Sequence, residues 1–67
     1  MKGLYSFVRS TQWNTEWVQV LANSEQEARG FIHAGERFDL RTFFITQTDI
    51  PDGIVFEYEI ENQNYEG

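Results

Sequence analysis

Apolar and polar positions alternate most regularly near the C-terminal end of the chain. Between positions 54 and 61, one set of positions holds Ile54, Phe56, Tyr58 and Ile60, and the other holds Val55, Glu57, Glu59 and Glu61. A period of two is typical of a strand with one apolar and one polar face. Residues 54–61 are therefore predicted to form a strand.

Three further segments are rich in β-branched and aromatic residues and are also predicted to be strands. They are 3–10, 16–22 and 41–48. The loop 10–15 is too short for a parallel crossover, so the first two strands are expected to pair antiparallel. Ile50-Pro51-Asp52-Gly53 has the residues of a tight turn, which predicts a hairpin between 41–48 and 54–61.

A helix is predicted between the second and third strands. Ser24 and Glu27 have the spacing of a capping box, in which both side chains bind free backbone N–H groups at a helix start. Gly30 weakens the helix by about 1 kcal/mol relative to alanine, and Gly35 is expected to end it. The apolar stripe consists of Ala28, Phe31, Ile32 and Gly35.

Together these elements predict one α+β domain over residues 1–67, with the order β-β-α-β-β. A four-stranded antiparallel sheet with one helix packed on one face is the expected architecture. Residues 62–67 are polar and are expected to form a flexible tail.

Composition narrows the class of protein. The chain has 67 residues, eleven of them aromatic (6 Phe, 3 Tyr and 2 Trp), which supply the apolar area that so short a chain needs to fold. It contains no cysteine, which fits a reducing cytosol. Neither a signal peptide nor a run of about 20 apolar residues is seen, so a soluble protein of the host cell cytoplasm, without membrane contact, is expected.

Charge is distributed unevenly along the chain. The net charge is −6, yet residues 1–47 hold five basic and five acidic side chains. Residues 48–67 hold six acidic side chains and no basic one. Such a field repels nucleic acid and attracts basic partners.

The predicted hairpin assigns faces to the side chains of its two strands. Phe44 and Thr46 share the helix-covered face with the alternating apolar set of 54–61, and the opposite face carries Glu57, Glu59 and Glu61 beside Phe43 and Ile45. These glutamates either dock on a basic surface or simply keep an edge strand solvated. A register slip of one residue would move Phe43 and Ile45 into the core.

Two tryptophans bear on the same question. Trp13 lies in the first predicted loop, where it is either an interface anchor or packs back over the sheet edge. Trp17 and Leu21 alternate with Val18, Val20 and Ala22, so large apolar groups must lie on both faces of this strand. That pattern favours a surface covered by a partner or a second copy.

No catalytic, metal or cofactor site is predicted. His33 is the single histidine and has no second ligand at metal spacing. Ser6, Ser10 and Ser24 lie in no nucleophile motif, and carboxylates on an open strand lack the cleft that would separate their pKa values. Aromatic residues on an open sheet can stack bases, but the basic stripe of a nucleic-acid-binding surface is missing, so no direct binding of nucleic acid is expected.

One pattern resembles a known group of proteins. A strand ending Val20-Leu21-Ala22 is followed by Asn-Ser-Glu-Gln-Glu-Ala over 23–28, which opens a short helix before further strands return. This arrangement, over residues 3–61, resembles small phage-encoded host-takeover proteins, namely anti-CRISPR proteins and phage inhibitors of bacterial RNA polymerase. The resemblance implies a compact acidic protein that blocks a nucleic-acid enzyme by occupying its basic groove, in some cases as a DNA mimic.

The leading hypothesis is a non-enzymatic inhibitor of a basic nucleic-acid-binding host protein, such as a CRISPR effector, an RNA polymerase or a restriction enzyme. Its predicted contact residues are Glu57, Glu59, Glu61, Asp49 and Asp52, with Trp13, Phe43 and Ile45 as anchors. The alternatives are a structural or regulatory subunit that self-associates through its sheet as a homodimer, and an accessory domain of a metabolic complex.

Overall fold

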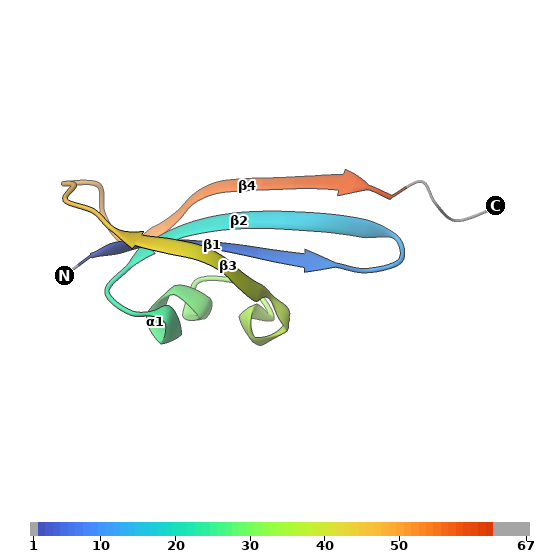
Figure 1. Ribbon diagram of the computed structural model, residues 1–67, viewed down its shortest axis with the longest axis horizontal. Helices are drawn as coiled ribbons and strands as arrows, with labels where there is room; N and C mark the ends of the chain where they lie inside the picture. The colour runs from blue at the N-terminus through green and yellow to red at the C-terminus, as the bar shows by residue number, and fades with distance from the viewer. Residues whose placement is uncertain (1, 63–67) are drawn as a thin grey trace.

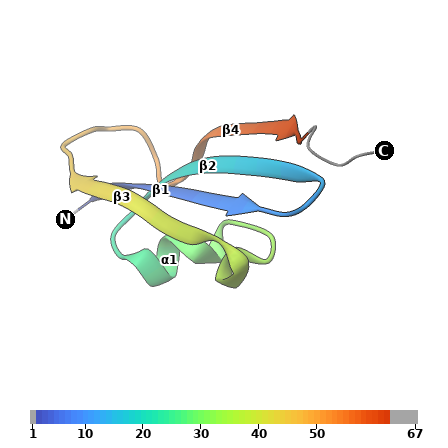
Figure 2. The ribbon, with the colours of Figure 1, turned by 45° about the vertical axis from the view of Figure 1, so that its right-hand side comes forward.

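A computed structural model describes residues 2–62 and shows a small α+β fold (Figure 1). The elements are β1 (Gly3–Ser10), β2 (Asn14–Ala22), α1 (Glu25–Gly30), the 3-10 turn η1 (Gly35–Arg37), β3 (Asp39–Ile45) and β4 (Gly53–Glu61). The four strands form one antiparallel sheet in the order β3-β1-β2-β4. Both helical segments lie on the same side of this sheet (Figures 1 and 2). The predicted fold class is confirmed; positions 63–67 of the predicted tail lie outside the described residues.

The predicted hairpin of the last two strands is wrong. β3 pairs with β1 and β4 pairs with β2, so the two strands lie at opposite edges of the sheet. The connection 46–52 crosses one end of the sheet between them (Figure 2). Lys2 holds this connection, because its ammonium group donates to the carbonyl of Ile50 at 2.7 Å and lies 3.1 Å from the carboxylate of Asp52. A crossing connection therefore replaces the tight turn that Pro51 suggested.

Two central strands and the helical layer build the core. Tyr5 and Phe7 of β1 lie opposite Val20 and Val18 of β2, and all four side chains are buried. The helical layer covers them with Ala28, Ile32 and Phe38. Because Phe7 is 1% exposed, it lies at the centre of this cluster.

The helix begins as predicted but is shorter. The Ser24 hydroxyl accepts a hydrogen bond from the Glu27 N–H at 3.1 Å, which confirms the N-cap, while the Glu27 carboxylate accepts from the N–H of Asn23. The helix ends at Gly30, and Gly35 begins η1 instead of ending α1. Neither helical segment of residues 2–62 is long and apolar enough to cross a membrane.

Arg29 fixes the two helical segments to each other. Its guanidinium donates to the carbonyls of Gly35 at 2.8 Å and Phe38 at 2.6 Å, and it lies 5.0 Å from the centre of the Phe7 ring. It also pairs with Glu25 at 2.8 Å. A single side chain thus joins α1, η1 and the core.

Candidate protein-binding surface

The side of the sheet that faces away from α1 has no covering element in the described chain, and we call it the open face (Figure 1). The register places Leu4, Trp17 and Leu21 of the two central strands on it, although Leu21 is only 4% exposed and adds little to the accessible surface. From the edge strands it receives Phe44 on one side and Phe56, Tyr58 and Ile60 on the other. Phe44 and Tyr58 are each more than half exposed. Apolar patches of this kind are uncommon on monomeric proteins unless they bind something.

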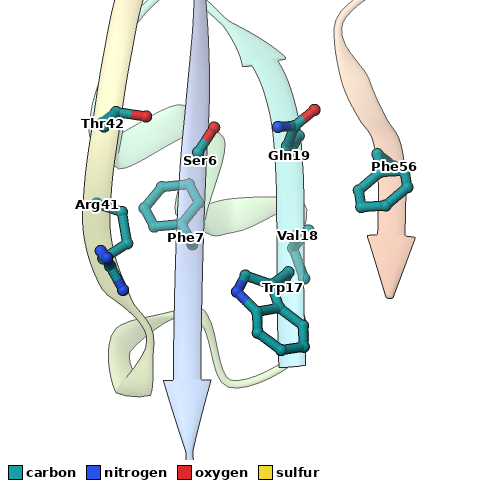
Figure 3. A pocket seen from close by; sticks show the side chains of 8 residues that line it. All are labelled: Ser6, Phe7, Trp17, Val18, Gln19, Arg41, Thr42 and Phe56. Carbon is teal, nitrogen blue, oxygen red and sulfur yellow. The ribbon is translucent and has the colours of Figure 1, made fainter. Parts of the chain in front are cut away.

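The aromatic side chains of the open face gather along β2 and β4. The rings of Trp17 and Tyr58 lie 5.6 Å apart between centroids, and those of Phe56 and Tyr58 lie 6.4 Å apart. Beside them, the centre of the face is a shallow hollow of about 340 Å³. Figure 3 shows Ser6 and Gln19 in the middle of this hollow, with Trp17 and Phe56 on one side. Arg41 and Thr42 of β3 close the opposite side (Figure 3).

The predicted faces of β4 are reversed in the structure. Phe56, Tyr58 and Ile60 point to the open face, and Glu57, Glu59 and Glu61 lie on the helix side. The glutamates can lie there because the helical layer covers only the first part of this side of β4. Ile54 and Glu57 line a hollow with Phe31 and Phe38, whereas the hollow beside Glu59 and Glu61 is lined by no residue of that layer. Sequence alternation predicted the correct grouping for residues 56–61 but the wrong covered face. It was wrong for Ile54, which lies on the helix side and not with Phe56, because the register of β4 shifts at Val55.

Glu57, Glu59 and Glu61 form a row along β4, which we call the acidic row. Their partners across the sheet are Val18, Glu16 and Asn14, in that order. Glu16 is paired with Arg9 at 2.5 Å, and the Asn14 amide donates to the carboxylate of Glu59. Within residues 2–62 no basic side chain pairs with any of the three. The acidic row therefore presents uncompensated negative charge.

Trp13 lies at the end of the acidic row. Its side chain is 66% exposed, and it lines a hollow together with Asn14, Glu59 and Glu61. The Trp13 carbonyl accepts a hydrogen bond from the N–H of Asn62 at 2.8 Å, which joins the first loop to the end of β4. The structure thus brings four predicted contact residues together: Trp13 and the acidic row.

Phe43 and Ile45 lie on the same side of the sheet as the acidic row but at the other edge. Three strand spacings of about 4.8 Å separate the edges, so roughly 14 Å lies between β3 and β4. The Phe43 ring stacks on Tyr5 at 5.1 Å, and both β3 side chains are about half exposed. The predicted contact between these residues and the glutamates is therefore wrong.

Asp49 and Asp52 belong to the connection at the opposite end of β4. Asp52 is neutralised by Lys2 and accepts a hydrogen bond from the amide of Asn23 at 3.3 Å. Five residues of extended chain separate Asp52 from Glu57, or about 17 Å. These two carboxylates are not part of the acidic row, and the role of Asp52 in this structure is to hold the connection.

The open face as a whole was not predicted from the sequence. Trp17 and Leu21 were recognised as apolar residues on a second face, but Phe56, Tyr58 and Ile60 were assigned to the core. The signal that could have found the surface is Gly30, where the helix ends, since a helix of six residues cannot cover a strand of nine.

The described residues offer few other side chains that could take part in catalysis or bind a metal ion. His33 lines a hollow of about 330 Å³ with Arg9, Glu16 and Glu57 on the helix side of the sheet. Among the described residues, no group of three or more histidine, aspartate or glutamate side chains is placed to hold a metal ion. That hollow offers an imidazole and carboxylates without an adjacent hydroxyl among its lining residues.

No family model matches the chain, and no curated protein and no solved structure is significantly similar to it. The resemblance to phage host-takeover proteins stays an expectation from the sequence.

Proposed function

We propose that this chain is a protein-binding module without a catalytic role, and that its partner docks on β4 and the adjoining open face. The observation that carries the proposal is the open face itself: the aromatic rings of Trp17, Phe56 and Tyr58 are gathered on a side of the sheet that no described element covers. Aromatic anchors in a central patch are what protein interfaces use for affinity.

The charge of the surface favours a basic partner. The acidic row lies on the same strand as Phe56 and Tyr58, so one edge of the sheet offers both apolar anchors and unpaired carboxylates. Complementary charge raises association rates and selects among partners. A nucleic-acid-handling protein blocked at its basic groove is such a partner, and this identity remains a prediction from the charge pattern and the resemblance.

Site-specific crosslinking tests the proposal. A photoreactive phenylalanine analogue placed at Tyr58 is expected to capture a basic protein from bacterial lysate, while the same analogue at Glu36 on η1 captures none. Adding Glu57→Lys and Glu59→Lys, or raising the salt concentration, should remove the captured protein. Equal capture from positions 58 and 36, or capture that ignores charge reversal, would refute binding through this surface.

The open face also supports a second candidate, a homodimer that packs two sheets face to face. Phe44 is 55% exposed on the open face, whereas its neighbour Ile45 is 53% exposed on the helix side. Sedimentation velocity separates the candidates: a dimer should dissociate with Phe44→Ser and persist with the matched control Ile45→Ser. A wild-type monomer at high concentration would exclude the homodimer.

A further inference from the structure

The outer edge of β4 carries free backbone groups. In residues 2–62 no strand pairs with this edge, because the sheet ends at β4. The N–H of Asn62 donates to the carbonyl of Trp13 in the loop that precedes β2. Successive residues of an antiparallel strand direct their N–H and C=O groups alternately toward and away from the neighbour. The backbone groups of Glu57, Glu59 and Glu61 therefore point outward, away from β2.

Between residues 56 and 61, the glutamates are the protection of this edge against a further strand. Natural edges are blunted by charged side chains, proline, bulges or covering elements. The register of β4 shifts between Ile54 and Phe56 and is then regular through Glu61. The stretch 56–61 contains neither lysine nor proline, and all of its side chains are exposed. It is a straight, accessible template.

The acidic row prevents this template from pairing with a second copy of itself. A symmetric antiparallel pair of β4 edges keeps the helix sides of both sheets on one side. Glu57, Glu59 and Glu61 of the two copies would then lie directly opposite each other, at the short distances where like charges are destabilising. Repulsion between glutamates therefore disfavours pairing of β4 with β4 of a second copy, whereas a strand with basic side chains would be attracted to this edge.

We propose that β4 accepts an extended segment of a partner as a fifth strand, in which basic residues alternate with apolar residues. The inference rests on the proposed function and names its partner chemistry. Outward N–H and C=O groups of β4 supply the main-chain hydrogen bonds of strand addition. Basic side chains of the segment lie opposite the acidic row, and its apolar side chains extend the open face beside Phe56, Tyr58 and Ile60.

Synthetic peptides as long as the strand, 9 residues, provide the probes. The first alternates lysine and valine; the second has the same composition with the lysines and valines in two blocks. A third keeps the alternating order but is N-methylated at the amides that would face β4, which removes main-chain donors and leaves charge unchanged. Binding is measured by titration calorimetry, and hydrogen exchange is followed at the amides of Glu57, Glu59 and Glu61.

The alternating peptide should bind about tenfold or more tightly than the other two, the gain expected from about 1.4 kcal/mol of ordered cross-strand contacts. It should also slow exchange at the three outward amides. Glu57→Lys with Glu59→Lys should abolish binding, and the matched control Glu36→Lys with Asp39→Lys, an equal change of charge at two exposed positions away from β4, should leave it unchanged. Circular dichroism confirms that the variants fold.

Two results would overturn strand addition. Equal affinity for the alternating, block and N-methylated peptides would mean that charge alone attracts them, and unchanged exchange at the outward amides would place the peptide elsewhere. Either result leaves the proposed function standing if Tyr58 still crosslinks to a partner. Absence of both peptide binding and crosslinking at Tyr58 refutes the proposed function as well.

Discussion

Gly30 ends α1 and Gly35 begins η1, and replacing each by alanine should change the free energy of unfolding in opposite directions. A Cβ atom added at Gly35 would lie 2.3 Å from the carbonyl oxygen of Arg29 and 3.1 Å from its carbonyl carbon. These are backbone atoms, which cannot turn aside as a flexible side chain can. A Cβ atom added at Gly30 meets nothing within 4 Å.

The expected magnitudes follow from these contacts. Gly35→Ala must push η1 away from α1, and forced overpacking costs about 1–3 kcal/mol, with further loss from the strained hydrogen bond of Gly35 to Ile32. Gly30→Ala should stabilise by about 0.5–1 kcal/mol, because alanine is the better helix former. A domain of 67 residues has roughly 3–10 kcal/mol of total stability, so Gly35→Ala removes a large part of it.

Urea unfolding followed by far-UV circular dichroism and by tryptophan fluorescence measures both changes. The transition midpoint should fall for Gly35→Ala and rise for Gly30→Ala, with equal slopes for wild type and variants. If both midpoints moved in the same direction, or if Gly35→Ala changed the free energy of unfolding by less than about 0.5 kcal/mol, the close packing of η1 on α1 would be refuted.

Three further substitutions test other parts of the structure by the same unfolding measurement. Arg29→Lys should lower the free energy of unfolding by about 1–3 kcal/mol, because an ammonium cannot reproduce the forked contacts to two backbone carbonyls. Glu25→Gln should cost no more than about 0.5 kcal/mol. Similar losses for the two variants would contradict the proposed role of the guanidinium. Phe7→Ala should cost about 3–5 kcal/mol and bring the protein close to unfolding, since the ring is 1% exposed, and a smaller loss would mean that the core repacks. Gly53→Ala should cost about 1–2 kcal/mol despite open space around it, because φ is 140° there, and an unchanged midpoint would show that the backbone can adjust.

The sequence was informative wherever the signal is local. β1 occupies the predicted residues, and β2 begins at Asn14, two residues before the predicted start. The cap at Ser24 formed because the hydroxyl and the amide that it binds are three residues apart in any helix that starts there. The helix length was overestimated because its apolar stripe continues beyond Gly30: Ile32 and Gly35 are buried without being part of α1.

The candidate site depended on information that is not local. Alternation along 54–61 established that Glu57, Glu59 and Glu61 share a face, and the charge count showed that this end of the chain holds the excess negative charge. Period two relates residues within a strand, but it does not say which face of the strand is covered. That choice was made by the short helical layer, which lies on the same side of the sheet as the acidic row and reaches only its first residue, Glu57.

The sequence by itself determined the strands, the start of the helix and the segregation of charge, since each follows from residues close together in the chain. Only the tertiary structure decided that β3 and β4 lie at opposite edges, because Pro51 and Gly53 are compatible with both a tight turn and a crossing connection. The pairing of β3 with β1 and of β4 with β2 requires the crossing connection. That selection separated Phe43 from the acidic row and left the edge of β4 free.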